Sequence, residues 1–260
     1  PDQKQGHFYE IWRDDINFPS WMRIEVPATE CPRISPEFLE KEKQELGTRI
    51  FNREYMCQFL NEAEYPMFMR TWFKNKMVSD VPHGAKFARR WDLAATEVRP
   101  GKDPDYTAGA LLARFEGRYY IVHMARFRET PLTNEKNIKT WADSDEFKYG
   151  RCMVRMEEEP GSGGKNTISH YALNILPGYD FKGVKHTGSK ADRARPFAAA
   201  CERGDVFIVE GNWNIRDMLD ELCSFPSGDH DDQVDALSGA FMDLKLSDLL
   251  PDDAAVFNIG

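Results

Sequence analysis

The pattern of apolar and polar positions changes character near residue 85. Before that point, aromatic residues and prolines are scattered without a clear period, and then two helices are expected at 36–47 and 48–60. Ser35 is a favourable N-cap followed by a proline, and Gly47 is a stop signal between the two helices. The N-terminal third therefore reads as helical and irregular, without the alternation that marks strands.

From residue 85 onward, short alternating segments predict strands. The stretch 85–92 reads as a strand that ends near Asp92, and 106–128 reads as an antiparallel hairpin with a tight turn at Glu116 and Gly117. The remaining pattern predicts helices at 132–147, 189–204, 212–225 and 230–246, and strands at 151–156 and 206–211. This order predicts an α/β domain with a mixed central β-sheet, made of an antiparallel hairpin plus parallel strands and flanked by helices.

We expect three parts along the chain. Residues 1–84 form a linking, helical segment, residues 85–246 form the α/β domain, and residues 247–260 form a loosely held, flexible tail.

Composition narrows the class of protein. The chain has 260 residues, of which 41% are hydrophobic and 30% charged, as expected for a globular protein with a core. It contains no apolar run of about 18 residues, so we expect no membrane span. The first residues lack the charged-then-apolar layout of a secretory signal, and the five cysteines follow neither a disulfide framework nor zinc spacing. We therefore expect a protein that is not secreted and works in a cytoplasm, with reduced cysteines.

The formal net charge of −9 argues against a broad nucleic-acid surface. Net charge misleads, however, where acids gather around bound cations, because the cations reverse the local sign. Positive residues also cluster locally, and we expect phosphate contacts from Lys165, Lys182, Lys185, Lys190 and Arg193.

Three acidic groups lie at the ends of predicted elements. Asp92 ends the first strand, Glu157 and Glu159 end a later strand, and an Asp cluster at 229–235 opens the last helix. Taken singly, each has an ordinary explanation as a turn residue, a solvated face or a helix start. Together, they can meet at the carboxyl edge of a sheet, and small residues beside them leave room for a ligand. Oxygen-only ligands favour Mg²⁺ or Mn²⁺, and a pair of such ions is a recurring device for phosphodiester cleavage.

Two other sequence features could belong to a functional site. The stretch 157–166 contains a Gly-rich loop, but Glu159 stands where the phosphate-loop pattern needs glycine and Asn166 where it needs Ser or Thr, so we reject an ATP site. His230 lies beside Asp231, where it could assist a metal ligand or cap a helix. No other cofactor-binding loop is expected.

Four stretches of this chain, in order, resemble the large terminase subunit of tailed bacteriophages, and more narrowly its C-terminal nuclease domain. They are Asp92, then MEEEPGSGGK, then TGSKADRARPFAAACERGDVFIVEGNW, then LCSFPSGDHDDQVDALSGAF. The resemblance covers roughly residues 85–245, and WMRIEVPA with the helical stretch 34–60 resembles the segment that links the terminase motor to its nuclease.

The resemblance implies a ribonuclease H-like fold and a metal-dependent endonuclease that cuts double-stranded viral DNA concatemers during genome packaging. By position, it assigns catalytic and metal-binding roles to Asp92, Glu157, Asp231 and Asp232, with Asp235, Asp105 and Glu159 as further candidates for the metal site. It also implies double-stranded DNA, the phage portal and the small terminase subunit as partners, an ATPase domain that this chain lacks, and work in the host cytoplasm.

Two other functions stay open at this point. The domain could be a DNA- or portal-docking module without activity of its own. It could also be another nuclease of the same fold, such as a junction resolvase.

Overall fold

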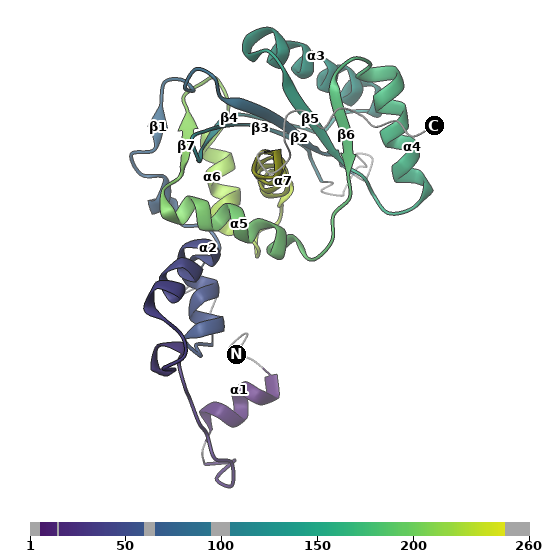
Figure 1. Cartoon of the computed structure of the whole chain (residues 1–260). Helices are drawn as coiled ribbons and strands as arrows, with labels where there is room; N and C mark the ends of the chain where they lie inside the picture. The colour runs from purple at the N-terminus through teal and green to yellow at the C-terminus, as the bar shows by residue number, and fades with distance from the viewer. Residues whose placement is uncertain (1–5, 15, 60–65, 95–104, 248–260) are drawn as a thin grey trace, which may run out of the picture.

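The computed structural model describes residues 6–14, 16–59, 66–94 and 105–247. Its centre is a seven-stranded sheet in the order β1-β7-β4-β3-β2-β5-β6 (Figure 1). The strands are β1 (Met77–Val78), β2 (Lys86–Asp92), β3 (Thr107–Phe115), β4 (Arg118–Phe127), β5 (Cys152–Glu157), β6 (Asp180–Val184) and β7 (Val206–Val209). The helices are α1 (Gly6–Arg13), α2 (Pro36–Tyr55), α3 (Pro131–Tyr149), α4 (Ser162–His170), α5 (Lys190–Arg203), α6 (Ile215–Ser224) and α7 (Asp232–Ser247).

The sheet mixes both strand directions, as the sequence predicts. β3 runs antiparallel to both β2 and β4, which makes the hairpin, and its turn places Glu116 and Gly117 at positive φ. The pairs β2–β5, β5–β6, β4–β7 and β1–β7 are parallel. The predicted fold class, a mixed sheet flanked by helices, is confirmed.

Helices cover both faces of the sheet, and β2 is buried from both sides. On one face, α7 packs on β2 and β3, and its small residues let it lie close. A Cβ at Gly239 would come within 2.9 Å of the Arg90 side chain, so a larger residue there would force the buried Arg90 to shift. On the other face, Trp91 packs with residues of α3 such as Ile138, and Gly109 leaves space for its ring. Strand alternation therefore sends Asp92 to the α7 side, since Arg90 is on that face.

The N-terminal part joins this body through α2. Gly47 interrupts the helix at φ 78°, which matches the expected break between two helices, and Ser35 accepts a hydrogen bond from the Phe38 amide as the predicted cap. α2 lies against α5, where the Thr48 amide donates to Glu202 at 2.8 Å. In Figure 1, α1 lies at the end of this part farthest from the sheet.

The division at residue 84 remains a prediction, but part of the linking segment belongs to the core. β1 pairs with β7, and Phe68 and Phe73 are buried in the largest apolar cluster. α7 ends at Ser247, and the rest of the predicted tail lies outside the described residues. Among the helices of the described ranges, none has the length and apolar character needed to cross a membrane.

Candidate active site

Asp92 and Glu157 lie at the same edge of the sheet because their strands are parallel neighbours. Trp91 of β2 is paired with Met156 of β5, so the next residue of each strand is one of the two acids. This is the carboxyl edge, where open α/β sheets build their sites. The predicted convergence of two acidic groups is present in the structure.

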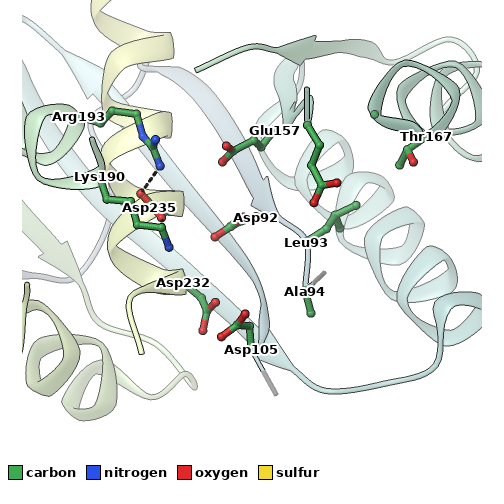
Figure 2. Close-up of a pocket in the computed structure, with 12 residues that line it drawn as sticks. Asp92, Leu93, Ala94, Asp105, Glu157, Thr167, Lys190, Arg193, Asp232 and Asp235 are labelled. Carbon is green, nitrogen blue, oxygen red and sulfur yellow. Dashed lines mark hydrogen bonds and ion pairs between the residues drawn. The ribbon is translucent and has the colours of Figure 1, made fainter. Parts of the chain in front are cut away.

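The third acidic group reaches the same place from the start of α7. Asp232 and Asp235 are buried, 5% and 9% exposed, and lie one helical turn apart. Asp105 precedes β3, whose first residues pair with the end of β2, so it also arrives at this edge. Figure 2 shows Asp92 between Glu157, Asp235 and Asp232, with Asp105 beside Asp232.

These acids line a pocket of about 380 Å³. Its lining residues are Asp92, Leu93, Ala94, Asp105, Glu157, Glu159, Gly164, Thr167, Lys190, Arg193, Asp232 and Asp235. Of the acids expected to form the site, only Asp231 is missing from this lining. Its carboxylate instead lies 2.5 Å from the Lys190 ammonium nitrogen.

Burial, together with nearby negative charge, raises the pKa of two of these carboxyls. Burial and then the nearby Asp235, Glu157 and Asp232 raise the pKa of Asp92 well above its ordinary value, while Lys190 opposes them. Burial raises the pKa of Asp232 to about 6, against a hydrogen bond from the Tyr106 amide that lowers it. Both carboxyls would therefore be stabilised in the ionised form by an added positive charge.

Two cations from α5 enter the pocket and hold Asp235. Ser189 caps this helix in a reciprocal capping box with Asp192, which fixes the first turn that carries Lys190 and Arg193. Lys190 lies 2.9 Å from one Asp235 oxygen and Arg193 lies 2.8 Å from the other. Burial lowers the pKa of Lys190, but its hydrogen bonds to Asp231 and Asp235 outweigh burial and raise it.

The other three predicted phosphate contacts lie outside this pocket. Lys165 on α4 and Lys182 on β6 are exposed, and Lys185 lies 3.5 Å from Glu158. Their proposed contact with DNA stays a prediction. Lys190 and Arg193, expected among the phosphate contacts, here form ion pairs with aspartates.

The sequence analysis missed His186 and α4. The His186 ring contacts the Arg90 guanidinium and lies 3.8 Å from a Glu157 oxygen, and burial with the nearby Arg90 and Arg193 lowers its pKa to about 4. It is therefore neutral at neutral pH. α4 supplies Gly164 and Thr167 to the pocket wall, and a second pocket of about 420 Å³ continues from there past Leu93.

The donor set fits a hard divalent cation. Carboxylate oxygens from two strands and one helix face the same pocket, and such oxygens are the ligands that Mg²⁺ and Mn²⁺ prefer. Within the described ranges, no three Asp, Glu, His or Cys side chains are already gathered closely enough to hold a metal ion. A cation that binds there has to draw the carboxylates closer together than they now lie.

Comparison with known proteins shows which family this chain belongs to. Residues 89–244 match the model of the terminase RNase H-like domain, a span that includes every acid of the pocket. The chain belongs to this terminase family. No curated protein matches it significantly by sequence.

Solved structures of terminases share its fold. The large terminase of a thermophilic bacteriophage is 13% identical, with a TM-score of 0.64, over 93% of this chain and 60% of that one. The human cytomegalovirus terminase nuclease domain is 11% identical, with a TM-score of 0.54, over 67% of this chain and 94% of that one. A Mn-soaked, inhibitor-bound form of the same viral domain has a TM-score of 0.51 and 11% identity, over 68% and 94%.

These matches also define what part of a terminase the chain represents. It spans about 60% of the length of the thermophilic phage protein and nearly all of the cytomegalovirus nuclease domain. At these identities the likeness shows a shared fold, and the matching family model describes that fold as RNase H-like.

Proposed function

We propose that this domain is a metal-dependent endonuclease that cuts double-stranded viral DNA concatemers during genome packaging. The observation that carries the proposal is the convergence of Asp92, Glu157 and Asp232 on one pocket in a chain of the terminase RNase H-like family. The Mn-soaked structure of the cytomegalovirus nuclease domain supports a divalent cation as the cofactor.

Asp92 is the central ligand in this proposal. It has carboxylate neighbours on both sides, Glu157 along the sheet edge and Asp232 on α7, so it would hold a cation together with either of them. Mg²⁺ or Mn²⁺ ions, two in number, would supply a nucleophilic hydroxide at neutral pH and stabilise charge on the scissile phosphate. No side chain then needs to act as the general base.

The other four candidate acids differ in how well they are placed to act as metal ligands. Asp235 faces the pocket but is held by Lys190 and Arg193, and Asp105 is exposed beside Asp232. Of the adjacent pair at the helix start, Asp232 is the better ligand candidate, because Asp231 is engaged by Lys190 and does not line the pocket. Glu159 lines the pocket from the loop after β5 and is exposed.

Exposed basic residues on α4, on β6 and just after β6 are the candidates for holding DNA. Lys165, Lys182 and Lys185 are exposed and would contact backbone phosphates, which position DNA without reading its sequence. When the acids bind cations, Lys190 and Arg193 lose part of their counter-charge and become available to the same phosphates.

The wider setting follows from the family. The thermophilic phage terminase is longer than this chain, and we propose that an ATPase domain belongs to the same terminase. The portal and the small terminase subunit are the expected assembly partners, and the host cytoplasm during phage assembly is the expected place of action.

A plasmid-cleavage assay tests the proposal. Supercoiled plasmid is incubated with the purified chain in Mn²⁺, Mg²⁺ or EDTA, and the Asp92→Asn variant is compared with Asp229→Asn. Asp229 is exposed and does not line the pocket, so it is the matched control. We expect metal-dependent nicking and linearisation by the wild type and the control, and none by Asp92→Asn. Equal inertness of all three with every metal would contradict the proposal, and a preference for branched DNA would redirect it to a junction resolvase.

A further inference from the structure

Tyr106, just ahead of β3, is held between two guanidinium groups. The Arg126 and Arg128 guanidinium carbons lie 3.7 and 3.6 Å from the centre of its ring, and the His230 ring packs against it edge-on at 5.2 Å. Arg126 lies near the end of β4, the strand that pairs with β3, and Arg128 directly follows that strand. Cation–π contacts this short fix the ring and therefore the backbone of residue 106.

The backbone held in this way contacts the candidate active site. The Tyr106 amide donates a hydrogen bond to the Asp232 Oδ2 atom at 3.2 Å. The next residue, Thr107, is fully buried, and its hydroxyl accepts from the Ala94 amide at 3.2 Å. The amide that orients Asp232 thus belongs to a segment fixed at the ring of Tyr106 and at the side chain of Thr107.

A second set of contacts fixes Asp232 from the helix side. Glu221 of α6 is 6% exposed, and its two oxygens accept from the backbone and side-chain nitrogens of Gln233 at 2.6 Å each. Gln233 directly follows Asp232, so these bonds hold the first turn of α7. Arg126 lies 3.2 Å from Glu221 while it covers the Tyr106 ring, and it therefore links the two sets of contacts.

We propose that Tyr106 and Arg126 are positioning residues that hold the Asp232 carboxylate ready for a divalent cation. This inference rests on the proposed function and names residues that do not line the pocket. Tyr106 acts through its ring, which is clamped, and through its amide, which binds Asp232. Arg126 acts by tying that ring to Glu221 and so to the start of α7. Outer partners of metal ligands typically change metal affinity by about 10- to 100-fold when they are removed.

Metal binding by the chain without DNA is the first test. Mn²⁺ is titrated calorimetrically into the wild type, Tyr106→Phe, Tyr106→Ala and Arg126→Gln. We expect Tyr106→Phe to match the wild type, because the ring is retained, and the other two to bind Mn²⁺ about 10-fold more weakly. Tyr149→Ala is the control, since it removes a ring stacked on Phe87 outside the pocket lining, and it should leave Mn²⁺ affinity unchanged.

Steady-state cleavage separates positioning from a DNA contact. Loss of positioning lowers kcat at subsaturating Mn²⁺ with little change in KM for DNA, and excess Mn²⁺ restores part of the rate. A rise in KM alone, or an equal loss in Tyr106→Phe and Tyr106→Ala, would overturn the proposal. So would wild-type affinity and kcat in both Tyr106→Ala and Arg126→Gln.

The hydrogen bond itself can be observed without activity. The chain has nine tyrosines, so selective ¹⁵N-tyrosine labelling gives an amide spectrum with few signals. We expect Asp232→Ala to shift the Tyr106 amide and speed its hydrogen exchange, with Asp229→Ala as the silent control. An unchanged Tyr106 amide would overturn the positioning role even if the wild type cuts DNA. A shifted amide in a protein that neither binds Mn²⁺ nor cuts would instead show that the proposed function has failed.

Discussion

Arg193 on α5 donates to Asp235 on α7 at 2.8 Å, and both side chains are largely buried, 17% and 6% exposed. This ion pair places a positive group inside the pocket that also holds Asp92. In the metal-free protein it offsets part of the acid repulsion, and in the metal-bound protein it competes with the cation for Asp235.

Removing Arg193 should therefore cost more stability in the metal-free protein than in the metal-bound protein. The Arg193→Met variant should lose about 2 kcal/mol of unfolding free energy in EDTA, because a buried carboxylate loses one of its two cations. In Mn²⁺ it should recover most of that loss. Urea unfolding with and without Mn²⁺ measures both. Arg216→Met, a change to an exposed arginine on α6, should show neither effect, and equal losses with and without metal would contradict the account.

Divalent ions should stabilise the protein by mass action. A ligand present at about 100 times its Kd adds roughly 2.7 kcal/mol, so millimolar Mn²⁺ should raise Tm measurably. Asp92→Asn should abolish this rise and should melt higher than the wild type in EDTA, because burial and neighbouring carboxylates disfavour the Asp92 charge. Differential scanning calorimetry checks both shifts. A variant that keeps the full Mn²⁺ response would exclude Asp92 as a ligand.

The raised pKa of Asp232 predicts a stability loss on raising the pH. Between about pH 4, its ordinary range, and its folded pKa of about 6, the folded protein keeps a proton that the unfolded chain has released. The unfolding free energy therefore falls as the pH rises through this window, by roughly 2–3 kcal/mol for such a shift.

Comparison with a neutral variant isolates this effect. In EDTA, wild type should lose about 2 kcal/mol more than Asp232→Asn between about pH 4.5 and pH 7.5, as measured by urea unfolding. Mn²⁺ affinity should also rise through the same window, because the ion displaces the proton. Parallel pH profiles for the two proteins would contradict the assigned pKa shift.

A second buried ion pair lies outside the candidate active site, and its contribution to the stability of the fold can be tested separately. Arg89 of β2 and Asp145 of α3 are both buried, and they share two hydrogen bonds of 2.5 Å and 2.8 Å. Asp145→Leu alone should cost roughly 3–5 kcal/mol, because it leaves a buried guanidinium without its partner. The double variant Arg89→Met with Asp145→Leu should recover much of that loss. Chemical denaturation of the wild type, the two single variants and the double variant gives the coupling, and additive losses would show that the pair is not coupled.

The parts of the fold with a clear pattern could be predicted from the sequence. The alternation of β2 and the turn of the β3–β4 hairpin are local features, and so are the Ser35 cap and the Gly47 break. α4 and β6 were not predicted. The α4 sequence SGGKNTISH has two glycines and little apolar periodicity, and β6 is short and contains Gly183, which lies so close to Ile168 that a Cβ would come within 2.7 Å.

The residues of the site could be predicted from the sequence where they lie at the ends of predicted strands or at the start of a predicted helix. Asp92 and Glu157 follow from parallel strands that end together, and Asp232 follows from an acidic helix start. The fixing of Asp232 by Tyr106 was not predictable, because the hydrogen bond joins residues 126 positions apart. Nor could the sequence indicate that Asp231 faces Lys190 while Asp232 faces the pocket, since that depends on how α5 and α7 pack.

Anomalous diffraction from a crystal soaked in Mn²⁺ tests the central claim most directly, since it locates the ion without relying on activity. The account predicts strong anomalous peaks within about 2.5 Å of oxygens of Asp92 and Asp232, which is ligand distance for a hard divalent cation. The Tyr106 amide should still be bonded to Asp232 in that crystal. A fully occupied Mn²⁺ elsewhere with no peak beside Asp92, or carboxylates of Asp92, Glu157 and Asp232 that remain apart with excess metal, would contradict it.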